Sequence, residues 1–168
     1  MNWVLHVANV MNSVLPVRET FGIRRLLANR GGMVVGKKTR ITHGVKFYDR
    51  YITIGDSVWI GMNTVFASTH KGRITIGNNV DIAPCCRIIS GTHELGGPER
   101  RAGTGSGADV SIGNGTWIGA ASCILPGAHI GEGSVVAAGS VVMAGNYPPN
   151  VLLTGVPARV KKSLPGAG

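Results

Sequence analysis

The chain has 168 residues, a length that favours one domain over two. Its 26 glycines are spread among isoleucines and valines, a pattern that argues against collagen and against disorder. A formal net charge of +9 is compatible with nucleic acid, an anionic membrane or a polyanionic small ligand as a partner. There is no zinc-finger spacing, basic zipper or aromatic RNA-binding motif, so we expect no nucleic-acid partner.

Residues 1–32 precede any repeat and are expected to form a short helical cap that ends at Gly31 and Gly32. The alternative is a membrane-surface face, in which basic side chains lie beside apolar ones. Its residues would be Arg18, Arg24, Arg25, Arg30, Trp3, Val4, Leu5, Phe21 and Leu26. Neither a signal peptide nor a membrane span is expected, because the segment has no basic n-region and is interrupted by polar residues. The predicted location is the cytoplasm, with contact at the inner membrane face as the alternative.

Residues 33–162 repeat in sixes. One apolar residue per repeat falls at Val35, Ile41, Phe47, Ile54, Ile60, Phe66, Ile76, Ile82, Ile88, Ile112, Ile118, Ile124, Ile130, Val136 and Val142. Three positions later Gly or Asn recurs, at Asn63, Asn79, Gly115, Gly127, Gly133, Gly139 and Gly145. These residues tolerate the positive φ that the third residue of a type II turn requires. Each hexad therefore predicts a short strand and a corner, three hexads close a triangular coil, and five stacked coils share one core.

The repeat breaks once at length, between Ile88 and Ile112, where the spare residues predict a protruding loop over 93–110. A smaller interruption, STHKGR at 68–73, should lie one coil earlier on the same edge. Long loops within compact repeats are usually functional or disordered, and this loop contains His93. The last residues, 163–168, are expected to be a solvated tail. Three cysteines, Cys85, Cys86 and Cys123, show no metal-binding or redox spacing and are expected to be small buried side chains in a reducing compartment.

The repeat resembles the hexapeptide signature of the left-handed parallel β-helix acyltransferases. The run SGTHELGGPERRAG is similar to one in the maltose, galactoside and nodulation-factor acetyltransferases, and VSIGNGTWIG and PPNVLLTGVPARVKK continue the likeness. The resemblance implies an all-β, left-handed parallel β-helix of about five coils, with a protruding loop after the third coil and a short N-terminal helical cap. It also implies an acetyl-CoA-dependent O-acetyltransferase, with a saccharide hydroxyl on a surface-polysaccharide or glycan precursor as the acceptor.

The same resemblance assigns roles to individual residues. His93 would be the general base, since imidazole can take a hydroxyl proton at neutral pH. Transfer would be direct, because no motif places a serine or cysteine as a nucleophile. Glu94 and Arg100 are weaker candidates for acceptor binding, and Glu94 could instead orient the imidazole. The acetyl-CoA residues would be Trp117, Ala120, Ala138, Gly139, Arg159, Lys161 and Lys162, the last three for the phosphates. No metal is expected.

Two departures limit the transfer of these roles. Ala144 stands where the family has a lysine, and Val65 lies near the position of an acceptor-binding asparagine, so no particular sugar is predicted. The family is trimeric with sites between subunits, which predicts a homotrimer. Alternatives are transfer to the amine of an amino sugar and a β-helix scaffold without catalysis. A carbonic anhydrase of the same shape is disfavoured, because it needs three metal-binding histidines that this sequence does not bring together.

Overall fold

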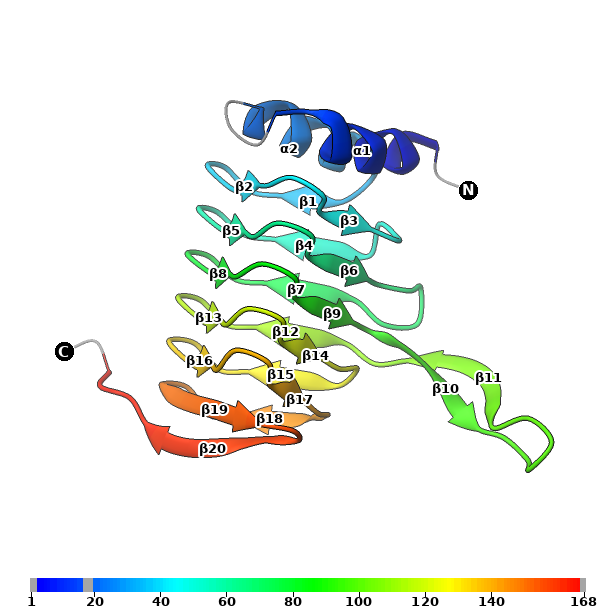
Figure 1. Cartoon of the computed structure of the whole chain (residues 1–168), viewed down its shortest axis with the longest axis vertical. Helices are drawn as coiled ribbons and strands as arrows, with labels where there is room; N and C mark the ends of the chain where they lie inside the picture. Colours follow the sequence, from blue (N-terminus) through cyan, green and yellow to red (C-terminus); the bar gives the residue numbers. More distant parts are fainter. Residues whose placement is uncertain (1–2, 17–19, 167–168) are drawn as a thin grey trace.

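The computed structural model describes residues 3–16 and 20–166 and shows two helices on top of a triangular β-helix (Figure 1). Three sheets form its walls, and their strands are parallel except for the last one, β20. Wall A contains β1 (Val34–Val35), β4 (Ile52–Ile54), β7 (Ile74–Ile76), β12 (Val110–Ile112), β15 (Ala128–Ile130) and β18 (Gly145–Tyr147). Wall B contains β2 (Arg40–Ile41), β5 (Trp59–Ile60), β8 (Asp81–Ile82), β13 (Trp117–Ile118), β16 (Val135–Val136), β19 (Val151–Gly155) and β20 (Ala158–Ser163). Wall C contains β3 (Lys46–Phe47), β6 (Val65–Ala67), β9 (Arg87–Ile89), β14 (Cys123–Ile124) and β17 (Val141–Val142).

The chain therefore winds through five complete coils and begins a sixth with β18 and β19, which confirms the predicted fold class. Each apolar residue of the hexads lies in register with its counterparts above and below, as Ile54 does with Val35 and Ile76. All fifteen are buried, and the rings of Phe47 and Phe66 stack with their centroids 5.3 Å apart. The seven predicted Gly and Asn corners all have positive φ.

Helices α1 (Trp3–Val14) and α2 (Phe21–Arg30) cover the open end of the first coil (Figure 1). Leu5 and Arg24 are buried there, and the Arg24 guanidinium donates hydrogen bonds to the carbonyls of Ile41, Leu15 and Pro16. The membrane-surface alternative is therefore wrong for these two residues, which face the protein, while Arg18 lies outside the described residues. No helix in the described part of the chain is long and apolar enough to cross a membrane.

The C-terminal end departs from the parallel winding that the hexads predict. Strand β20 runs antiparallel to β19, with Thr154 opposite Arg159. The reversal occurs at Gly155, whose φ of 105° few other residues adopt, and Pro157, which has no N–H to donate. The predicted solvated tail also begins later than expected, because Ser163 belongs to β20 and the Leu164 N–H donates to the Asn150 carbonyl at 2.7 Å.

Candidate functional site

Every departure from six-residue spacing falls on the edge between walls C and A, here called the C/A edge. The three segments that carry extra residues on this edge follow Phe47, Phe66 and Ile88, and they are residues 48–51, 68–73 and 90–109. Because successive coils stack, these three segments lie next to one another. The extra residue after Phe47 was the sequence signal that the first of them also belongs to this edge.

The third segment is a two-stranded hairpin that protrudes from the prism (Figure 1). Strand β10 (Gly91–Leu95) pairs antiparallel with β11 (Ala102–Gly107), so half of the region predicted as a loop, residues 93–110, is regular structure. The hairpin is fixed at its base by Lys71, whose Nζ donates to the Gly105 carbonyl at 2.5 Å, and by the Ala108 N–H, which donates to the Ser90 carbonyl. These bonds give the hairpin a defined direction despite its small and polar residues.

His93 lies on β10 with one ring nitrogen engaged. Its Nδ1 is 2.9 Å from the Gly103 carbonyl oxygen. Since a carbonyl only accepts hydrogen bonds, Nδ1 carries the proton in the neutral ring and Nε2 keeps a free lone pair. The imidazole is thus held in the tautomer that a base requires. Its partner is Gly103 and not the neighbouring Glu94.

His93 opens onto a pocket of about 490 Å³ at the base of the hairpin. The lining residues are Asp49, Thr69, His70, Lys71, Gly91, Thr92, His93, Gly105 and Ser106. Gly105 pairs directly with His93, and a Cβ added there would meet no atom within 4 Å, so space is left beside the imidazole. Glu94 and Arg100 do not line this pocket. Sequence reasoning missed Asp49, His70 and Lys71, although both interruptions that supply them were visible in the spacing.

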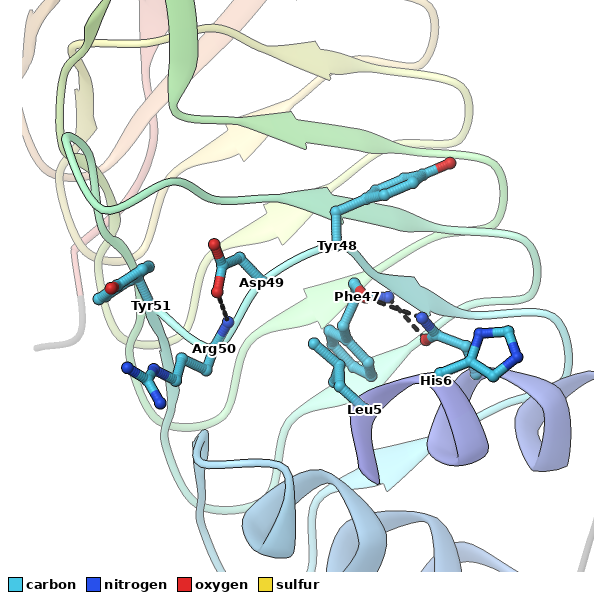
Figure 2. Close-up of a pocket in the computed structure, with 8 residues that line it drawn as sticks. Leu5, His6, Phe47, Tyr48, Asp49, Arg50 and Tyr51 are labelled. Atoms are coloured by element: carbon cyan, nitrogen blue, oxygen red, sulfur yellow. Dashed lines mark hydrogen bonds between the residues drawn. The ribbon is translucent and has the colours of Figure 1, made fainter. Parts of the chain in front are cut away.

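A second and larger pocket, of about 800 Å³, adjoins the first through Asp49. It lies between α1 and the segment 47–51, where Leu5 lies beside the Phe47 ring and the His6 imidazole points away from that ring (Figure 2). The Asp49 carboxylate accepts a hydrogen bond from the Arg50 N–H at 2.7 Å, and this bond holds the corner of the first coil. The space beside His93 therefore extends along the C/A edge towards the helical cap.

The residues predicted to bind acetyl-CoA lie elsewhere. Trp117 projects from wall B with 56% of its surface exposed. Ala120, Ala138 and Gly139 form a column on the edge between walls B and C, here called the B/C edge, where the Gly139 N–H donates to the Ala120 carbonyl at 2.8 Å. A Cβ on Gly139 would meet no atom within 4 Å, so this backbone is open to a ligand.

The three predicted phosphate-binding cations follow in β20. Arg159, Lys161 and Lys162 are all exposed on this last strand of wall B. In a triangular prism wall B is opposite the C/A edge, and the buried core lies between them. Within a single chain, the predicted cofactor residues lie on the wall B side of the prism, and His93 and its pocket lie on the opposite side. The two sets of residues therefore do not meet in one chain.

The cysteines differ from the expectation of three buried side chains. Cys86 is buried and Cys123 is partly buried, and burial raises the pKa of both thiols. Cys85 is exposed, because its corner turns the side chain outwards at a φ of 64°. Among the described residues no group of three or more His, Cys, Asp or Glu side chains could hold a metal ion.

Comparison with known proteins gives consistent similarities. Residues 109–144 match the family model described as bacterial transferase hexapeptide (six repeats). The chain is 33% identical to the galactoside O-acetyltransferase of Escherichia coli over 134 residues, 69% of this chain and 66% of that protein. It spans between 41% and 66% of the length of the first curated relatives that it matches.

Solved structures extend the similarity to nearly the whole chain. A galactoside acetyltransferase in complex with coenzyme A covers 98% of this chain and is covered over 80% of its own length, with a TM-score of 0.85 at 28% identity. A hexapeptide-repeat-containing acetyltransferase from Vibrio cholerae has a TM-score of 0.84 at 30% identity, over 98% of this chain and 91% of its own, and it has also been solved with acetyl coenzyme A. The left-handed winding of such structures is the one that the family resemblance implies for this chain.

Proposed function

The chain belongs to the family of hexapeptide-repeat acetyltransferases, and on this premise we propose that it transfers the acetyl group of acetyl-CoA to a hydroxyl group of a saccharide. The observation that carries the proposal is the hydrogen bond from His93 Nδ1 to the Gly103 carbonyl at 2.9 Å. It leaves Nε2 as a proton acceptor at the mouth of a pocket. The cytoplasm is the predicted location.

His93 acts as the general base in a direct transfer. The acceptor oxygen attacks the carbonyl carbon of the thioester while Nε2 takes the hydroxyl proton. The tetrahedral intermediate then collapses, the C–S bond breaks, and the departing sulfur recovers that proton from the imidazolium. The products are the acetyl ester and free coenzyme A, and His93 returns to the neutral form with Nδ1 still bonded to Gly103.

The cofactor half of the site is proposed for wall B and the B/C edge. The open backbone column of Ala120, Ala138 and Gly139 suits the amides of a pantetheine arm, and the exposed cations of β20 suit its phosphates. Arg159, Lys161 and Lys162 supply three positive charges, which offset the loss of the family lysine at Ala144. Trp117 lies three residues before the column and would contact the arm near its reactive end.

We propose that the complete site forms between two copies of the chain in a homotrimer. His93 protrudes from the C/A edge while the cofactor residues lie on the opposite wall, so one copy would deliver the base to the cofactor held by the next. The protruding hairpin of Figure 1 supports this arrangement because it extends away from its own prism.

The test replaces the base. For His93→Asn we expect kcat to fall at least about 100-fold, because proton transfer contributes roughly that much or more, while KM for acetyl-CoA stays unchanged. The assay measures thiol release from acetyl-CoA with a panel of simple glycosides, nucleotide sugars and amino sugars. Mass spectrometry of the product locates the acetyl group and separates ester from amide formation.

The matched control is His129→Asn. His129 lies on wall A, where its Nδ1 is 2.9 Å from Ser111 Oγ, and it has no part in the pocket. This variant should keep the wild-type rate. Activity of His93→Asn within about threefold of the wild type, with the same acceptor, would show that the base is another group.

A further inference from the structure

The outer side of the helical cap carries a row of apolar side chains that the described chain leaves uncovered. On α1 the row follows spacings of four, three and four residues, so its members share one face of the helix. The row consists of Trp3, Val7, Val10 and Val14. Between 37% and 71% of the surface of each is exposed. On α2, which lies beside α1 (Figure 1), Ile23 and Leu26 are each half exposed, and these six residues are here called the apolar cap face.

This face points away from the β-helix. Leu5 on α1 and Arg24 on α2 lie on the opposite sides of their helices and are buried, and both helices contact strands of the first coil on that side. The apolar cap face is therefore the end of the molecule. The membrane-facing surface considered from the sequence included Leu5 and Arg24, which pack inwards, but also Trp3 and Leu26, which face outwards.

Positive charge is concentrated at the same end. Residues 1–48 contain eight Lys or Arg and one Asp or Glu, so +7 of the net charge of +9 belongs to this part of the chain. Five of these cations are exposed on the end of α2 and on the first coil. They are Arg30, Lys37, Lys38, Arg40 and Lys46. None of the five forms an ion pair with another described residue. The apolar cap face is thus flanked by cations whose charge is left uncompensated by the described chain.

An anionic lipid bilayer matches this combination, because it offers hydrocarbon and negative headgroups in one plane. A second copy of the cap does not, since two surfaces of the same charge repel each other. The six side chains supply a single hydrogen-bond donor, the Trp3 indole, which suits a fluid surface better than a particular protein partner. With 12 residues, α1 is about 18 Å long and too short for a hydrocarbon core of about 30 Å, so it would lie along the surface.

We infer that the apolar cap face binds the surface of an anionic lipid bilayer. Val10, Val14 and Leu26 enter the boundary between headgroups and acyl chains, and the flanking lysines contact the lipid phosphates. Trp3 lies at the headgroup level that indoles favour. This inference goes beyond the proposed function and does not depend on it.

The experiment measures sedimentation of the full chain with lipid vesicles, without acetyl-CoA. The wild type should bind vesicles of equal parts phosphatidylcholine and phosphatidylglycerol, and it should bind pure phosphatidylcholine about tenfold more weakly or less. Raising the salt concentration from about 0.01 to about 0.1 M should weaken the binding, because the screening length falls from about 30 to about 10 Å.

The apolar contribution is tested by Val10→Glu, which places a charge in the middle of the face. This variant should bind anionic vesicles about tenfold more weakly or less. Val156→Glu is the matched control. Val156 is 72% exposed and lies in the turn between β19 and β20, at the other end of the molecule, so this variant should bind as the wild type does.

The charge contribution is tested by replacing both Lys37 and Lys38 with Gln. We expect binding about tenfold weaker or less, because each lysine near an anionic surface contributes roughly fivefold. Replacing Lys161 and Lys162 with Gln removes the same charge from β20, six strands along wall B and about 29 Å away. At 0.1 M salt this control should bind as the wild type does, because the distance exceeds the screening length.

Trp3 provides a direct readout of insertion. Acyl chains that carry bromine quench an indole that reaches them, so they should quench the fluorescence of the bound wild type. In Trp3→Phe most of this quenching should disappear, while the affinity for the vesicles stays within about threefold, because phenylalanine is also apolar. This measurement and the lysine variants keep the inference testable if Val10→Glu does not fold.

Four results would overturn the inference. The first is no binding to anionic vesicles at low salt, and the second is an equal loss of binding in the two lysine variants, which would assign the binding to overall charge. The third is a change in the oligomeric state of Val10→Glu without lipid, which would assign the face to a second copy. The fourth is binding to a glutamate-rich peptide but not to vesicles, which would assign it to an acidic protein.

Discussion

Cys85 occupies a corner whose backbone conformation suits glycine. Its φ is 64°, in the left-handed region that costs an L-residue with a side chain roughly 1–2 kcal/mol. The thiol is exposed, so removing it sacrifices little packing. Cys85→Gly should therefore raise the free energy of unfolding by about 0.5–1 kcal/mol, after the greater freedom of glycine in the unfolded chain is deducted. The urea midpoint measures this change.

Cys86→Gly is the matched comparison. That side chain is buried against the same corner, and its Sγ is 3.2 Å from the Gly119 carbonyl oxygen. We expect this variant to be destabilised, because a packed side chain is lost without relief of any strain. If Cys85→Gly is destabilised as well, the strain assigned to the corner is absent.

The sequence predicts a corner with positive φ correctly where the residue at that corner is of a type that tolerates positive φ. Asn63 and Gly115 were predicted as corners with positive φ because their types tolerate it, and both have it. Cys85 and Ala121 have the same conformation, at 64° and 58°, although their types disfavour it. Stacking on the coils above and below imposes the turn at these two positions, and residue propensity carries no signal of that.

The cap closes the β-helix by side chains that take the place of a missing strand. Asn29 both donates to the Val35 carbonyl, at 3.1 Å, and accepts from its N–H, at 2.8 Å. Asn9 forms the same pair of bonds with Phe47, at 2.8 and 2.9 Å. The first strands of walls A and C are thus hydrogen-bonded on the side where no coil precedes them.

We expect Asn29→Ala and Asn9→Ala each to lower the free energy of unfolding by about 1–2 kcal/mol, because each leaves a donor and an acceptor of the first coil without a partner. The two effects should add, since the residues serve different walls. Amide hydrogen exchange provides a local readout, with faster exchange at Val35 in the first variant and at Phe47 in the second. Asn146→Ala, on an exposed position of wall A, should change neither quantity.

Equal stability of both cap variants and the control would mean that water replaces the asparagines at no cost.

The cap could be predicted as helical from residues 1–32, but its hydrogen bonds could not, because they join residues up to 38 positions apart. The hairpin shows the same limit. Its sequence lacks alternating apolar residues and reads as a loop. Its order depends on the bond from Lys71, which belongs to another segment of the C/A edge, and on the bond from the Ala108 N–H to the Ser90 carbonyl across its own base.

The shape of the whole molecule follows from the six-residue period, and the position of the site within it does not. The repeat predicts stacked triangles and places His93 at a break in them. It cannot show that the break and the predicted cofactor residues are on opposite sides of the prism. That relation depends on which hexads share a wall, and the strand order of the three sheets gives it.

This opposition leads to a prediction about mixed assemblies. The variant His93→Asn lacks the base, and the triple variant Arg159→Ala, Lys161→Ala, Lys162→Ala lacks the cations of β20. Each alone should be nearly inactive. If every site takes its base from one copy and its cofactor from the next, a trimer containing both variants has one site with two intact halves. An equal random mixture should then recover about one quarter of the wild-type activity.

The measurement is thiol release after the two variants are unfolded together and refolded, with separately refolded and then mixed samples as the control. Recovery is expected only in the co-refolded sample, and its absence there, with trimers present in sedimentation, would place both halves of the site in a single chain.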